Sequence, residues 1–95
     1  MNKYEIMFIV RPDMEEAEIR KTAEEMKKVL DNGQTTFVEE KNMGQRELAY
    51  EIKKFKTGYY FLYVVEANTD VVNEFDRVVR ISENVIRHLI VKVED

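Results

Sequence analysis

Hydrophobic residues recur with two different periods in the first third of the chain, and the change of period predicts a strand followed by a helix. Residues 4–10 are mostly β-branched and aromatic, as in a strand, and Pro12 marks where such a strand must stop. Asp13, with Glu16 three residues later, is expected to form a capping box, and residues 31–33 to end the helix. The apolar stripe of this helix, at the spacing of one buried face, is Ile19, Thr22, Ala23, Met26, Val29 and Leu30.

The middle of the chain predicts two further strands. The first extended region covers residues 35–53 and is expected to be interrupted at 42–44. After that break, apolar residues alternate with charged ones, which is typical of an antiparallel or edge strand. Residues 55–58, which end in a glycine, are expected to turn the chain into the aromatic run at 59–65.

A second helix and a last strand complete the pattern. Residues 68–70 supply an N-cap, residues 82–84 end the helix, and residues 85–93 are expected to form the final strand. The order strand, helix, strand, strand, helix, strand predicts one ferredoxin-like plait of the α+β class over residues 1–95, with both helices on one face of a four-stranded antiparallel sheet. In that topology the first and third strands lie in the middle. The apolar positions of the second helix are Val71, Val72, Phe75, Val78 and Val79.

Alternation within the central strands assigns their two faces. Tyr59 and Phe61 are expected to point toward the helices, and Tyr60 away from them. The faces of the last strand are ambiguous, because Arg87 indicates that the even-numbered residues face the helices, whereas Lys92 indicates the reverse. On the first strand, the residues expected to face the helices are Tyr4, Ile6, Phe8 and Val10. The opposite face would carry a contiguous apolar patch, which indicates a protein partner unless these are merely scattered surface residues: Met7, Ile9, Tyr60, Leu62 and Val64.

Four aromatic residues in KTGYYFLYVV raise the alternative of an RNA-recognition motif that stacks bases on its sheet. That motif needs a basic residue before its glycine and a small residue between two displayed aromatics. Thr57 and Tyr60 occupy those positions, and the aromatics in register are expected in the core. An ordinary core strand is therefore the preferred interpretation.

Charge argues against a protein that binds nucleic acid unaided. The net charge is −4, and phosphate contacts need clustered lysine and arginine. Basic residues do gather in segments 41–56 and 77–92, while most carboxylates lie elsewhere. This distribution fits a protein that shares RNA with a basic partner, and it also fits ordinary solvated surface.

Catalytic chemistry is not expected. His88 is the only histidine, Ser82 the only serine, and there is no cysteine, so nucleophile–base pairs and the usual zinc sites lack their residues. We expect no enzyme activity, no cofactor, no metal and no small-molecule substrate. No apolar run reaches the roughly 20 residues of a membrane span, so we expect no membrane association and a cytoplasmic location.

The longest motif, GQRELAYEIKKFKTGYYFLYVV from Gly44, together with VVRISENVIRHLIVKVED and YEIMFIVRPDM, resembles the family of the sixth protein of the bacterial small ribosomal subunit. The likeness covers essentially the whole chain. Its most specific elements are the Gly44–Ile52 stretch and Val85-Ile86-Arg87. Many members have proline after the LAY triplet, where this chain has Glu51.

This resemblance implies a non-catalytic structural role on the ribosome. Family members pair with the eighteenth small-subunit protein and bind the central domain of the small-subunit rRNA as a heterodimer. Arg87 would contact phosphate bidentately. The RNA- and partner-facing positions of the family fall here on Lys3, Tyr4, Arg46, Tyr50, Arg80, Arg87 and Lys92.

Two other plait functions stay open on sequence alone. A small-ligand-binding regulatory plait would need a glycine-rich turn or polar cluster at a strand–helix junction, and residues 11–13 are a poor candidate. An acyl phosphatase of this fold needs an arginine–asparagine pair near the first loop, together with a glycine-rich loop. Arg11 is present, but that loop is not.

Overall fold

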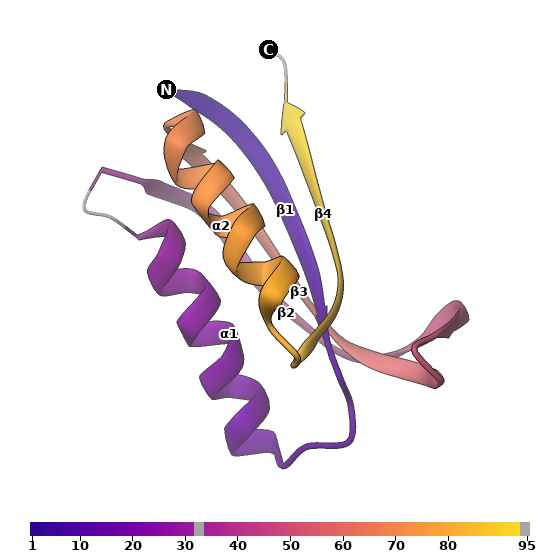
Figure 1. The fold of residues 1–95 in the computed structure, drawn as a ribbon. Helices are drawn as coiled ribbons and strands as arrows, with labels where there is room; N and C mark the ends of the chain where they lie inside the picture. Colours follow the sequence, from indigo (N-terminus) through magenta and orange to yellow (C-terminus); the bar gives the residue numbers. More distant parts are fainter. Residues whose placement is uncertain (32–33, 94–95) are drawn as a thin grey trace.

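The computed structural model describes residues 1–31 and 34–93. Two helices and four strands alternate in these ranges in the predicted order (Figure 1). They are β1 (Asn2–Val10), α1 (Glu16–Leu30), β2 (Thr36–Ile52), β3 (Phe55–Ala67), α2 (Thr69–Ile81) and β4 (Val85–Val93).

The four strands form one antiparallel sheet in the order β2-β3-β1-β4, so β1 and β3 are central as predicted. Both helices cover the same face, and the other face, called the open face below, carries no helix (Figure 1). This arrangement confirms the ferredoxin-like plait. The two edges of the sheet, β2 and β4, are separated by the two central strands.

The core lies between the helices and the sheet, and its centre is aromatic. Phe8 of β1 stacks on Phe61 of β3 with ring centroids 5.3 Å apart, and Phe75 of α2 lies 6.2 Å from Phe8. Such pairs contribute about 0.5–1.5 kcal/mol each beyond the area they bury. Phe61 is 5% exposed and Tyr59 packs against the same cluster, which confirms the predicted face of β3. The four helix-facing residues predicted on β1 are also buried here: Tyr4, Ile6, Phe8 and Val10.

The face of β4, ambiguous in the sequence, is decided by its register. His88 pairs with Phe8, and Ile90 with Ile6, so both point toward the helices. His88 lies 2.7 Å from Asp76 of α2, which also pairs with Arg80. The hydrogen bond with His88, and secondarily Arg80, holds the pKa of the Asp76 carboxyl below its usual value. A polar contact thus ties α2 to the edge strand.

The predicted cap of α1 is wrong. The helix begins at Glu16, its N-cap is Glu15, and no side chain caps it. The Asp13 carboxylate instead accepts two hydrogen bonds from Arg11, at 2.7 and 2.9 Å. A charge-assisted pair within the loop outcompetes the neutral amide donors of the helix end. The glycine cap predicted at residue 33 lies outside the described residues.

The predicted turn at 55–58 is also wrong, because the chain reverses earlier. Ile52 pairs with Phe55, which leaves Lys53 and Lys54 as the two turn residues, both with positive φ (49° and 71°). Gly58 serves a different purpose inside β3. A Cβ at this position would lie 2.3 Å from Cγ2 of Ile9, so the glycine permits a close approach of strand and side chain.

The predicted interruption at 42–44 is a bulge within a continuous strand. The register of β2 against β3 shifts between Asn42 and Gly44, and Gly44 has φ of 75°. Glycine adopts this conformation without steric cost, so the strand bends there without ending.

Replacing Gly58 with alanine should lower the free energy of unfolding by about 1–3 kcal/mol, because the new methyl group overlaps Ile9. Urea unfolding followed by circular dichroism measures the change. Gly44→Asn is the matched control, since nothing lies within 4 Å of a Cβ there and asparagine tolerates positive φ. Equal stability of Gly58→Ala and the parent protein would contradict the role assigned to this glycine.

Candidate functional site

The centre of the open face is an apolar surface built by three strands. Met7 pairs with Leu62 on one side and with Leu89 on the other, so these residues form one row across the sheet. In the next row, Glu5 is flanked by Val64 and Val91. A shallow hollow of about 140 Å³ lies over these rows, lined by Glu5, Met7, Leu62, Leu89 and Val91.

The end of the β2–β3 hairpin bends back toward this face because of a further, wider bulge. Glu47 pairs with Thr57, and Ile52 with Phe55, so the four residues 48–51 lie opposite Lys56 alone. Extra residues on one strand increase the local twist and bend of a hairpin. The LAY triplet of the family motif, residues 48–50, makes up three of the four bulged residues.

The bend brings the bulged segment over the sheet. The side chains of Leu48, Tyr50 and Ile52 enclose a hollow of about 250 Å³ with residues from β1, β3 and β4. The Tyr50 hydroxyl accepts a hydrogen bond from the Arg87 guanidinium, whose Cζ lies 5.5 Å from the centre of the tyrosine ring. On the other side, the Arg11 guanidinium lies 5.3 Å from the Phe55 ring. Two arginine–aromatic contacts therefore fix the hairpin to the body of the protein.

The predicted apolar patch is present on the open face but is only partly accessible. Ile9 and Val64 are 2% and 7% exposed, because neighbouring side chains cover them. Met7, Tyr60 and Leu62 are half-buried. The most accessible apolar residues of this face were missed in the sequence: Leu89 and Val91 of β4, 52% and 43% exposed. The signal in the sequence that could have identified them was the presence of large apolar residues in an edge strand.

The predicted charged residues do not form one cluster. Arg46 and Arg87 lie at the hairpin side of the open face, and Lys3 lies at its opposite end, where it pairs with Glu66 and Val93. Lys92 pairs with the inward-facing Tyr4 and so lies on the helix side of β4. Arg80 projects from α2 and is paired with Asp76. Among the described residues of the predicted set, Tyr50 and Arg87 are joined by a side-chain hydrogen bond, and Tyr4 and Lys92 are neighbours on adjacent strands.

Tyr4 is poorly placed for the role that the family resemblance implies. Its ring is 7% exposed within the helix-side core, and its hydroxyl is hydrogen-bonded to the Thr69 hydroxyl at 3.2 Å. The phenol therefore anchors the start of α2 to β1.

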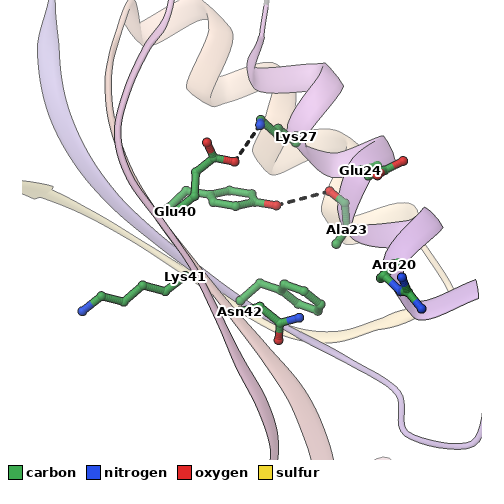
Figure 2. A pocket seen from close by; sticks show the side chains of 9 residues that line it. Arg20, Ala23, Glu24, Lys27, Glu40, Lys41 and Asn42 are labelled. Carbon is green, nitrogen blue, oxygen red and sulfur yellow. Dashed lines mark hydrogen bonds and ion pairs between the residues drawn. The ribbon is translucent and has the colours of Figure 1, made fainter. Parts of the chain in front are cut away.

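A third depression lies on the other side of the sheet, between α1 and β2 (Figure 2). It has a volume of about 330 Å³ and a floor that includes Phe61 and Tyr63. Lys27 crosses it to pair with Glu40 at 2.6 Å. Burial and the two nearby carboxylates raise the pKa of Tyr63 to about 12, so its phenol stays protonated near neutrality. Lys27 and Glu40 neutralise each other, while Arg20 and Lys41 pair with carboxylates that do not line the groove.

None of these three hollows contains a group of metal ligands among the described residues. Within residues 1–31 and 34–93, no three histidine or carboxylate side chains converge as metal ligands. Tyr59 and Phe61 are directed to the helices, so the aromatic pair of a base-stacking platform is not displayed. No helix in these ranges is long and apolar enough to cross a membrane.

Comparison with known proteins connects this geometry to one family. The family model for ribosomal protein S6 matches residues 3–92. The small ribosomal subunit protein bS6 of Halalkalibacterium halodurans is 46% identical over 95 residues, covering the full length of both chains. That of Shouchella clausii is 44% identical over 94 residues, or 99% of each chain.

A solved structure gives the same result. The crystal structure of 30S ribosomal protein S6 from Thermotoga maritima matches with a TM-score of 0.90 and 29% identity, covering 97% of this chain and 87% of that one. Sequence and fold agree over nearly the entire length of the chain. The chain therefore belongs to the ribosomal protein S6 family.

Proposed function

We propose that this chain is a structural, non-catalytic component of the small ribosomal subunit. In this proposal it binds the central domain of the small-subunit rRNA as a heterodimer with the eighteenth small-subunit protein. Family membership over residues 3–92 carries the proposal. The open face supports it, because an apolar centre with Arg46 and Arg87 beside it suits a site shared by a protein and an RNA.

The partner protein is proposed to dock on the rows of the open face centred on Met7. Leu89 and Val91 are about half exposed there, and Leu62 is half-buried beside them. Burying such side chains contributes roughly 25 cal/mol per Å² of apolar area. Glu5 and Lys3 lie beside this centre, where their charges can set the orientation of a basic partner.

The RNA is proposed to contact the hairpin side of the same face. Arg46 is exposed, donating from Nε to the Met43 carbonyl at 3.1 Å, and its remaining donors are available to phosphate. Arg87 can exchange its tyrosine partner for phosphate, which accepts stronger, charge-assisted hydrogen bonds. The net charge of −4 opposes tight binding by this chain alone, so a basic partner is needed to neutralise more phosphates.

A small-ligand-binding role finds less support. The groove between α1 and β2 is the candidate on the helix side, but Lys27 and Glu40 within it already pair with each other (Figure 2). Its other two cations, Arg20 and Lys41, pair with carboxylates outside the groove. We therefore retain the ribosomal role.

The chain should sediment with small ribosomal subunits in moderate salt. A tagged copy expressed in a bacterial host, with subunits separated on a sucrose gradient, tests this directly. Recovery of the protein only at the top of the gradient, with host subunits intact, would refute the proposed function.

Leu89→Asp should weaken heterodimer formation at least tenfold, because a carboxylate would be desolvated against the partner. Unfolding free energy should change by less than about 0.5 kcal/mol, since the side chain is exposed. Ile81→Asp is the matched control, being an exposed aliphatic residue at the end of α2. Calorimetric titration with the partner protein measures both, and equal affinities for the two variants would place the partner elsewhere.

Arg46→Ala and Arg87→Ala should each reduce the affinity of the heterodimer for a central-domain rRNA fragment roughly tenfold, the size expected for one charge-assisted hydrogen bond. Arg77→Ala, on the exposed side of α2, should leave affinity unchanged. Filter binding across a salt series measures all three, and the chain alone should bind weakly. Tight, salt-dependent binding by the isolated chain would contradict the need for a partner.

A further inference from the structure

Some cations of the described residues pair with carboxylates and others do not, and four of the unpaired ones lie close together in the sequence at the end of the hairpin. Within residues 1–31 and 34–93, carboxylates pair with Arg11, Arg20, Lys27, Lys41, Arg77 and Arg80. None of the four cations in segment 45–57 takes part in an ion pair of the described residues, and all are exposed: Arg46, Lys53, Lys54 and Lys56. Only two carboxylates share this segment with them.

The two turn residues carry an unfavourable backbone as well as an unpaired charge. Lys53 and Lys54 both have positive φ, in a two-residue turn closed by the Ile52–Phe55 pair. Turns of this kind strongly prefer Asn-Gly, because in the left-handed region a Cβ atom lies too close to the following carbonyl oxygen, and only glycine, or asparagine through a local hydrogen bond, avoids this strain. A residue type that is unfavourable for the local backbone conformation is expected where its side chain serves a function.

The tip of the hairpin, Lys53 and Lys54, is carried by a segment that is held in place by contacts with the rest of the protein. The hairpin end extends past the ends of β1 and β4, away from both helices (Figure 1). Arg11 against Phe55 and Arg87 against Tyr50 hold it from two sides. Its lysines therefore project from a preorganised element, which lowers the entropy cost of binding.

Lys56 differs from the two turn lysines. It lines a hollow together with Glu47 and Glu51, so neighbouring carboxylates weaken its attraction for an anion. Lys53 and Lys54 lie at the extreme of the hairpin and do not line that hollow.

We propose that the tip of the β2–β3 hairpin is a phosphate-binding element, in which Lys53 and Lys54 contact the phosphodiester backbone of RNA. This inference rests on the proposed function and adds two residues that the family resemblance did not assign. The contact is independent of base sequence, because an ammonium group neutralises phosphate as a point charge. Both lysines are exposed at the turn, so their ammonium groups are accessible to phosphate.

Two double variants separate charge from structure. K53Q/K54Q removes both charges and nearly keeps the side-chain length, while K53N/K54G removes the charges and relieves the turn. The heterodimer with each variant is titrated with the central-domain rRNA fragment at several salt concentrations. Both variants should bind more weakly, by about threefold to thirtyfold at low salt. The slope of log affinity against log salt should become shallower by about 0.7–0.9 for each phosphate that the tip no longer neutralises.

One of the two tip variants, K53N/K54G, should be more stable than the parent protein. K53N/K54G should unfold at a higher urea concentration than the parent protein, although it binds RNA less tightly. The matched control is K21Q/K28Q. It removes two exposed lysines of α1 that form no ion pair among the described residues, and it should leave affinity and slope unchanged.

Each outcome decides the proposal. Parental affinity and slope in both tip variants would overturn it while leaving the proposed function intact. An equal loss of affinity in K21Q/K28Q would also overturn it, because general charge and not the tip would then be responsible. Failure of the parent heterodimer to bind the rRNA fragment would instead refute the proposed function itself.

Discussion

The burial of the aromatic residues of β1 and β3 beneath the two helices is the constraint on which the rest of the structure depends. Phe8 and Phe61 stack in the core with Phe75 of α2 beside them. Because side chains alternate along a strand, this burial forces Met7 and Leu62 to the opposite face. The apolar surface proposed to receive a partner is therefore a direct consequence of how the core is packed, and it cannot be removed by a simple shift of register.

The hairpin adds a second layer of organisation that the plait alone does not require. A bulge of four residues against one bends its end over the open face, and Gly58 allows the strand to approach Ile9 closely. The Tyr50–Arg87 contact then joins a segment of the β2 edge to the β4 edge, across two intervening strands. Residues named by the family motif thus define the shape of the open face before any partner is bound.

The distribution of charge also differs between the helix side of the protein and the hairpin. On the helices most arginines are neutralised by carboxylates of their own or a neighbouring turn, as with Arg77 and Glu74. Such exposed pairs contribute little to stability, but they leave the helix side without excess positive charge. The hairpin end keeps its cations out of the ion pairs of the described residues. An acidic protein can in this way present a local basic surface, which suits the proposed assembly in which a basic partner supplies further charge.

Sequence alone determined the order of the elements, the plait topology and the faces of the two central strands. These features follow from the spacing of apolar residues within short segments of the chain. Phe61 and Phe75, for example, lie on the apolar side of their own strand and helix, which the core must bury. The same local signals failed at the cap of α1 and at the turn, because Asp13 and Gly58 each serve a competing interaction. Asp13 pairs with Arg11, and Gly58 makes room for Ile9.

Only the tertiary structure decided which predicted site residues meet. Tyr50 and Arg87 are 37 residues apart in the chain, and no local pattern indicates that a bulge will carry one to the other. Likewise, the burial of Ile9 and the exposure of Leu89 depend on what the hairpin covers and what it leaves open. Periodicity tells which face of a strand a side chain occupies, but accessibility on that face is set by contacts between distant segments.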